Sequence, residues 1–216
     1  MKNLVRILTF SLVSLFIYQA NAQNIAIKGG LNLAKMLQKD DDDTYSKDQS
    51  MKLGFHVGAT VDFPINDFLS FEPGLFLTTK GFKNESDFMG AKASIKTSLY
   101  YLDVPLTLKA SHDLGELKIY GVAGPYVGFG LSGKTKSKAT FMGEEKSETK
   151  DIKWGSGNAD DYKRLDFGLT IGAGVEISAF IVGLSYDLGL ANISPYQDNG
   201  TKIKNRVLKL SVGYKL

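Results

Sequence analysis

The chain contains no cysteine, and this absence excludes a lipid-modified N-terminus, disulfides and thiolate chemistry. Histidine is scarce as well, because His56 and His112 are the two in the sequence. Charge of one sign is not in excess, since 26 Lys and Arg stand against 23 Asp and Glu. This balance gives no indication of a nucleic-acid partner. The composition therefore leaves little material for catalysis or nucleic-acid binding.

Long apolar runs are confined to the start of the chain. Lys2 and Arg6 precede a short apolar stretch, and "ANA" at 20–22 matches the cleavage pattern of a secretory signal. The stretch is shorter than the roughly 20 residues that a spanning helix needs. We therefore predict a cleaved signal peptide over 1–22 and one domain over 23–216. No later segment has 18 consecutive apolar residues, which excludes a helical membrane protein.

The rest of the chain alternates between apolar and polar residues. In "MKLGFHVGATVDF", at 51–63, every second residue from Met51 to Phe63 is apolar, and the residues between them are polar or glycine. A period of two predicts a strand with one apolar and one polar face. The pattern recurs and predicts eight strands in all. The other seven lie at 24–34, 68–81, 98–110, 117–133, 164–177, 180–191 and 207–216.

The connections between these strands alternate in length. Three are short turns, whereas the other four are long and polar. Short turns at one rim and long loops at the other are typical of outer-membrane barrels. The predicted long loops are 35–50, 83–96, 134–163 and 194–202.

The composition of the polar face distinguishes a membrane barrel from a soluble barrel. A membrane barrel has apolar residues outside, whereas a secreted lipocalin-like barrel has them inside. Glycine weakens a solvated strand, but inside a narrow barrel it makes room for long charged side chains. The glycines of the polar face are Gly54, Gly58, Gly74, Gly124, Gly128, Gly130, Gly168, Gly172, Gly174, Gly183, Gly189 and Gly213.

Charges on the same face also favour the membrane barrel. A cation that faces lipid costs on the order of 2–4 kcal/mol at mid-membrane, whereas buried charges of opposite sign can pair. We therefore predict a paired internal network. Its predicted cations are Lys28, Lys52, Lys80, Lys109, Lys118, Arg164, Lys209 and Lys215, and its anions are Asp62, Glu72, Asp103, Asp166, Glu176 and Asp187.

Pro73, Pro105 and Pro125 fall within predicted strands. Proline cannot donate a ladder hydrogen bond, and a closed barrel has no free edge for it. We therefore expect a bulge or a broken ladder bond near each proline.

Several stretches, in order, resemble the PorT-type outer membrane protein beta-barrel family of Bacteroidetes. The resemblance implies an eight-stranded outer-membrane barrel, and PorT itself is associated with a protein secretion system. It implies no catalytic residue. The final strand, 207–216, also resembles the assembly signal of outer-membrane barrels, with Leu216 where that signal prefers phenylalanine. The stretches are "IKGGLNLAKM", "GFHVGATVDF", "FEPGLFLTTKGF", "YLDVPLTLK", "YGVAGPYVGFGLSG" and "LGLANI".

The sequence offers few residues for chemistry. His56 is predicted to face the barrel interior and His112 to lie in a short turn, so shared zinc ligation is not expected. Asp62 is six residues from His56, roughly 20 Å along a strand, which is too far for a dyad. The acidic run at 39–48 lacks the spacing of a calcium loop and is interpreted as solvated. No catalytic, cofactor-binding or metal-ligating residue is predicted.

The sequence thus predicts a non-enzymatic integral protein of the outer membrane, with a structural or surface-interaction role and little or no conductance. The loop at 134–163 is expected to extend the flanking strands or to contact lipopolysaccharide or a protein partner. The other expected partners are outer-membrane lipid and the barrel-assembly machinery, through the C-terminal strand. The alternatives are a PorT-like accessory of a secretion system and a soluble lipocalin-like barrel that binds a ligand.

Overall fold

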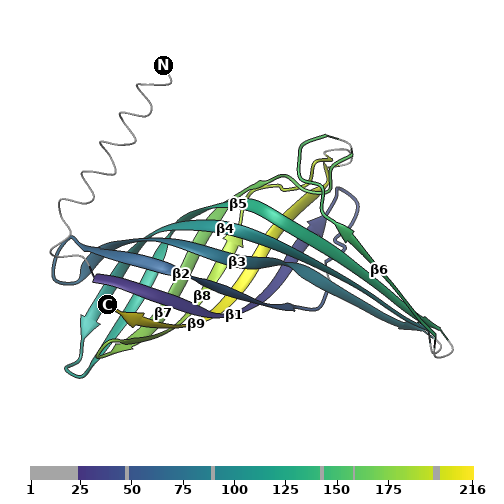
Figure 1. The fold of residues 1–216 in the computed structure, drawn as a ribbon. Helices are drawn as coiled ribbons and strands as arrows, with labels where there is room; N and C mark the ends of the chain where they lie inside the picture. The colour runs from purple at the N-terminus through teal and green to yellow at the C-terminus, as the bar shows by residue number, and fades with distance from the viewer. Residues whose placement is uncertain (1–23, 47–48, 89–90, 142–143, 158, 197–199) are drawn as a thin grey trace, which may run out of the picture.

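The computed structural model describes residues 24–216, apart from 47–48, 89–90, 142–143, 158 and 197–199. The predicted signal peptide, 1–22, lies outside the described residues. Within the described residues, no helix is long and apolar enough to cross a membrane. The strands of this part of the chain, labelled in Figure 1, are β1 (Asn24–Lys39), β2 (Lys52–Pro64), β3 (Leu69–Phe88), β4 (Ala91–Asp113), β5 (Leu117–Phe141), β6 (Glu144–Asp151), β7 (Leu165–Ile177), β8 (Phe180–Gly189) and β9 (Lys202–Lys215).

Eight of these strands close into a ring in chain order (Figure 1). In this ring, each of the strands β1 to β4 pairs antiparallel with the next strand, β5 pairs with β7, and β7, β8 and β9 continue the order. The ring closes where β9 pairs with β1, from Lys215 opposite Ala26 to Lys202 opposite Lys39. The predicted eight-stranded antiparallel up-and-down barrel is therefore confirmed. Strand β6 lies outside the ring and pairs with the end of β5.

The two ends of the barrel differ as the connection lengths predict. The short turns at 65–68, 114–116 and 178–179 share one end, which we call the turn end. The C-terminus lies at this end in Figure 1. The longer connections gather at the opposite end, which we call the loop end.

A sheet projects beyond the loop end, where the sequence predicts loops at 83–96 and 134–163 (Figure 1). The prediction of a loop is wrong for the first segment, because β3 stays paired with β4 as far as Phe88. The expectation that the second segment extends the flanking strands is confirmed for its first part, where β5 stays paired with β4 as far as Thr140 and with β6 as far as Phe141. We call the described residues of 82–97 and 133–151 the projection. Apart from its base, which contains Phe82 and Thr97, this sheet has both faces in water, and every residue of β6 is exposed. Without a buried face, the strands need no apolar period, so the pattern did not reveal them.

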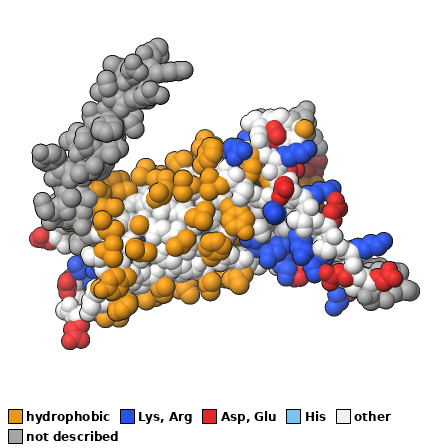
Figure 2. Space-filling view, viewed as in Figure 1, with side chains coloured by type: hydrophobic (Ala, Val, Ile, Leu, Met, Phe, Trp, Pro, Cys, Tyr) orange, Lys and Arg blue, Asp and Glu red, His pale blue; other side chains and the backbone are white. Residues whose placement is uncertain are grey.

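The barrel wall has its apolar side outside. Phe55, Leu169 and Leu210 are 43%, 48% and 51% exposed, whereas Lys52 and Asp166 are 3% and 0% exposed. Figure 2 shows the exposed apolar side chains as a band across the visible face of the barrel. This is the arrangement predicted for a membrane barrel and the reverse of a lipocalin-like one.

The three strand prolines lie where the ladders are interrupted. Pairing of β2 with β3 skips Pro73, pairing of β3 with β4 skips Pro105, and pairing of β4 with β5 skips Pro125. The register is the same on both sides of each gap, so no extra residue is inserted. The interruptions are broken ladder bonds rather than bulges. A closed barrel accommodates a proline in this way, because the neighbouring strand makes no ladder pair at the position where the N–H donor is missing.

Glycines on the inner wall seat aromatic rings as well as charges. A Cβ atom at Gly130 would lie 2.5 Å from the Trp154 ring, and one at Gly174 would lie 2.5 Å from the Tyr120 hydroxyl. At Gly128 the neighbours are a carboxylate and an ammonium group. The predicted role for glycine, room for charged side chains, therefore applies at Gly128, while rings use the space at the other two.

Candidate functional site: the filled barrel and its loop end

An ion-pair network fills the barrel near the turn end. The ammonium of Lys109, on β4, lies 2.9 Å from Asp62, 3.6 Å from Glu72 and 2.6 Å from Glu176. These carboxylates come from β2, β3 and β7, so one cation ties together strands on opposite walls. Alternation along each strand places the charges inside, where each must find a partner. Two pairs extend the network, Lys28–Glu72 at 2.9 Å and Lys215–Glu176 at 2.7 Å.

A second network fills the barrel nearer the loop end. Lys80 lies 3.0 Å from Asp103 and 2.9 Å from Asp166, and all three side chains are almost fully buried. Lys209 pairs with Asp187 and lies 3.9 Å from Asp103. The predicted internal network is therefore present as two groups. Aromatic rings also flank the Lys80 ammonium, at 4.6 Å for Tyr101 and 4.5 Å for Tyr126.

Three of the predicted cations lie outside these two networks. Lys118 is partly exposed at the turn end, and Arg164 donates to the carbonyl of Gly130 over 2.9 Å at the loop end. Lys52 is buried, and its ammonium lies 3.5 Å from the carbonyl of Lys80. Among the described residues, no carboxylate forms an ion pair with Lys52. Alternation predicts which way a side chain points, but not how far along the barrel a partner lies.

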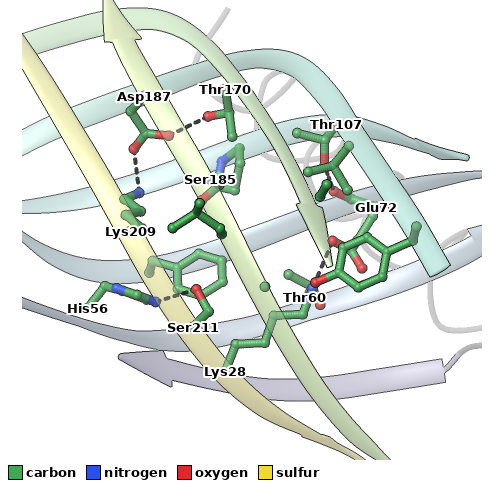
Figure 3. Close-up of a pocket in the computed structure, with 17 residues that line it drawn as sticks. Lys28, His56, Thr60, Glu72, Thr107, Thr170, Ser185, Asp187, Lys209 and Ser211 are labelled. Carbon is green, nitrogen blue, oxygen red and sulfur yellow. Dashed lines mark hydrogen bonds and ion pairs between the residues drawn. The ribbon is translucent and has the colours of Figure 1, made fainter. Parts of the chain in front are cut away.

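A cavity of about 80 Å³ separates the two networks (Figure 3). Lys28 and Glu72 line it from one network, and Asp187 and Lys209 line it from the other. Thr170 donates a hydrogen bond to Asp187 over 2.7 Å at its wall. The volume suits a few water molecules rather than an organic substrate.

His56 lies on the wall of this cavity, as a member of the polar interior. Its Nδ1 is 2.7 Å from Asn32 Oδ1, and its Nε2 is 2.9 Å from Ser211 Oγ, as Figure 3 shows for Ser211. Within the described part of the chain, no carboxylate is hydrogen-bonded to the ring. His112 is exposed at the turn end of β4, so the two histidines share no site, as predicted. Where the chain is described, the hydrogen-bond partners of the His56 ring are therefore an amide and a hydroxyl group.

An apolar cluster closes the barrel at the loop end. The described residues of the connections 152–164 and 190–196 lie at the mouth, and several of their side chains pack on residues of the inner wall. We call this cluster the plug. The sequence predicts a long polar connection here, and it gives no indication that residues of this segment pack on the inner wall. The plug contains Met36, Leu99, Tyr101, Tyr162, Ala191 and Ile193, with Phe82, Ile152, Trp154 and Ile203 packed against them.

Trp154 anchors the plug. Its ring stands edge-on to Tyr101 at 5.5 Å between centroids and fills the space over Gly130. The ring centroid of Tyr162 lies 6.5 Å from that of Trp154, and the backbones of the two residues form an isolated parallel β-bridge. Burial raises the pKa of Tyr162 to about 12. The signal available in the sequence was the presence of isolated apolar residues, such as Ile152 and Trp154, in a polar segment. Gly130 on the facing wall leaves the space that the Trp154 ring fills.

The acidic run at 39–48 bonds largely to itself where it is described. Asp40 accepts hydrogen bonds from the backbone of Asp42 and Asp43, at 2.9 and 2.7 Å. The Tyr45 hydroxyl also donates to Asp40 over 2.7 Å, and this hydrogen bond lowers the pKa of the Asp40 carboxyl. No group of three or more His, Asp or Glu side chains within the described ranges could hold a metal ion.

The chain matches a family model described as "Outer membrane protein beta-barrel domain" over residues 18–194. The chain belongs to this family. It is therefore an integral barrel of the outer membrane, with the apolar band of Figure 2 as its lipid-facing surface. Because such barrels have short periplasmic turns and longer extracellular loops, the turn end is periplasmic and the loop end extracellular.

Similar folds occur among solved structures. Ail of Yersinia pestis, crystallised with the heparin analogue sucrose octasulfate, is 17% identical, covers 90% of this chain and 99% of its own, and has a TM-score of 0.38. Neisserial surface protein A is 14% identical, with coverages of 89% and 97% and a TM-score of 0.44. OprG of Pseudomonas aeruginosa is 13% identical, with coverages of 90% and 96% and a TM-score of 0.44. A search of curated proteins gave no match.

Proposed function

We propose that this outer membrane barrel conducts no solute, catalyses no reaction and acts at the cell surface through its projection. The observation that carries the proposal is the filled interior. Two ion-pair networks occupy the lumen, and the plug covers its extracellular mouth. Eight strands leave room for little besides side chains. The part of the molecule that is free to interact is therefore outside the lumen.

The projection supports a surface role by its geometry. Four strands carry it away from the barrel, and its sheet presents two solvated faces (Figure 1). On one face of strand β6, at an open edge of the sheet, acidic Glu144 and Glu148 alternate with basic Lys146 and Lys150, and such charges oppose uncontrolled strand pairing. A regular, extended surface of this kind suits recognition of a partner better than a mobile loop does, because less order is lost on binding.

Planar-bilayer recording tests the closed lumen. The purified, folded protein is expected to give no steady channel steps, because the side chains of the two networks and the plug fill the lumen. Reproducible steps from a preparation with the heat-modifiable mobility of a folded barrel would contradict the proposal.

Crosslinking on intact cells tests the surface role. The chain has no native cysteine, so Ser147→Cys on β6 and Glu116→Cys at the turn end each give one attachment point for a photo-crosslinker. We expect a discrete adduct from position 147 and none of that mass from position 116. A version of the Ser147→Cys protein that gives no adduct in any growth condition would contradict an interaction through the projection.

The remaining assignments belong to the same proposal. Residues 1–22 are proposed to be removed during export, leaving 23–216 as one domain. The apolar side of β9 is proposed to engage the barrel-assembly machinery, as its resemblance to the assembly signal implies. A narrower membership of the PorT type, with a role in secretion, is a prediction that gene deletion followed by a secretome comparison tests.

A further inference from the structure

Three lysines form a row across the base of the projection. Lys83 on β3 is the direct cross-strand partner of Lys96 on β4, and Lys96 is the direct partner of Lys136 on β5. The fourth position in the row, on β6, is Thr149. Directly opposed side chains on one face have Cβ atoms about 4.5–5.5 Å apart, and like charges there are destabilising. Three adjacent ammonium groups therefore do not stabilise this sheet unless an anion binds between them.

The neighbouring rows leave this positive charge incompletely balanced. The row nearer the barrel contains Lys134 and Asp151, and the row farther out contains Glu85 and Lys138. Lys83 lies 2.7 Å from Glu85, Lys134 lies 3.8 Å from Asp151, and Lys138 lies 2.5 Å from Glu145 one row beyond. Among the described residues, no carboxylate pairs with Lys96 or Lys136.

The row faces the same way as the lipid-contacting side chains. Along β4, outward positions run from Leu102 in the apolar band through Tyr100 to Ser98 and then Lys96. Apolar wall, aromatic residue and cation in this order match hydrocarbon, interface and headgroup region of a membrane. Lys96 is six residues beyond Leu102, which is roughly 20 Å along the strand and less in height because barrel strands are tilted. Figure 2 shows Lys and Arg side chains gathered beside the apolar band, at the base of the projection.

We infer that Lys83, Lys96 and Lys136 bind the phosphate groups of the glycolipid in the outer leaflet. Charge complementarity selects an anion, and the position directly above the apolar wall selects one that is tethered to the membrane. A phosphorylated glycolipid satisfies both conditions, because its acyl chains lie along the apolar wall while its phosphates reach the ammonium groups. This inference rests on the proposed surface function and adds one ligand to it. The ligand would bind at the base of the projection rather than at its tip.

The test titrates folded protein in nonionic detergent with bisphosphorylated lipid A and counts bound lipid by native mass spectrometry. The variant Lys96→Gln/Lys136→Gln removes the two lysines that lack a carboxylate partner. The matched control, Lys146→Gln/Lys150→Gln, removes the same charge from β6 on the opposite face of the sheet. We expect the first variant to weaken binding by about tenfold or more, since each cation near such a surface adds to the attraction. The control is expected to bind within about twofold of the wild type.

Two further measurements distinguish a lipid-attached phosphate from free phosphate as the bound anion. Dephosphorylated lipid A should bind the wild type and the lysine-row variant equally weakly. Inorganic phosphate at millimolar concentration should not displace lipid A, because it lacks the contact with the apolar wall. Equal weakening in both double variants, unchanged affinity in the lysine-row variant, or full displacement by inorganic phosphate would each overturn the assignment.

A trimmed protein separates this site from the proposed surface function. Excising 85–94 and 137–148 removes the tip but keeps all three lysines of the row. This protein should bind lipid A like the wild type while losing adducts that depend on the tip. Loss of lipid A binding on trimming alone would contradict a site at the base.

Discussion

The barrel interior and the projection contain the same kinds of charged pairs in opposite surroundings. Inside, Lys80 lies 2.9 Å from Asp166, and both side chains are fully buried. In the projection, Lys138 lies 2.5 Å from Glu145, and both side chains are about half exposed to solvent. The distances are alike, yet water screens the second pair and not the first.

The difference shows that surroundings, rather than distance, determine what an ion pair does for this protein. An exposed pair gains little because each charge is already solvated. A buried pair has lost that solvation, so removal of one partner leaves a charge with no compensation. The interior is therefore intolerant of single changes, whereas the projection can vary its charges and evolve a binding surface.

The largest contrast should come from removing one cation in each region. Lys80→Met leaves Asp103 and Asp166 buried without their main partner, and should lower the free energy of unfolding by about 3–5 kcal/mol. Lys138→Met, its control in the projection, should produce a far smaller change. Urea titration of both variants in the same lipid vesicles measures the effect. Comparable losses in the two would contradict the difference in surroundings.

Adding a lysine to an outer apolar position tests whether that position faces lipid or water. Leu169 on the wall and Ile95 in the projection are 48% and 45% exposed, so their accessibility does not distinguish them. Leu169→Lys should destabilise the protein by about 2–4 kcal/mol because the new ammonium faces lipid. Ile95→Lys should change little because its ammonium faces water. Folding titrations in vesicles compare the two, and a tolerated lysine at position 169 would be inconsistent with a lipid-facing wall.

The smallest predicted effect concerns the seat of the plug. Gly130→Val should displace the Trp154 ring and cost about 1–3 kcal/mol through overpacking. Gly121→Val, on the same strand, serves as control, because a Cβ atom there would meet the carbonyl oxygen of Gly172 at an ordinary contact distance of 3.8 Å. Trp154 is the single tryptophan, so its fluorescence reports the change directly. A red shift is expected for the first variant, and identical spectra for both would argue against the plug.

The barrel wall could be predicted because its physics is local. A strand between lipid and a packed lumen must alternate, so residues such as Phe55 and Lys52 reveal their faces from the sequence alone. The charges of the interior could be predicted for the same reason. Which cation meets which carboxylate could not, because the contacts of Lys109 with Asp62 and Glu176 depend on strand register around the whole ring.

The projection and the plug were outside the reach of the pattern for different reasons. Both faces of β6 meet water, so nothing in its sequence needs to alternate in hydrophobicity. In the plug, Trp154 and Tyr162 lie far apart in sequence from Tyr101 and Leu99, against which they pack. Their contact depends on the path of a long connection, and no local period encodes that path.

Spin labelling along β7 tests the central claim most directly, since the chain has no native cysteine to compete with the label. Single cysteines from Leu165 to Ile177 would each carry a nitroxide in lipid vesicles. Labels at odd positions such as 169 and 171 should be accessible to oxygen dissolved in the bilayer, whereas labels at even positions such as 170 should be shielded. Odd positions that collide instead with a water-soluble nickel chelate would show that the apolar wall does not face lipid.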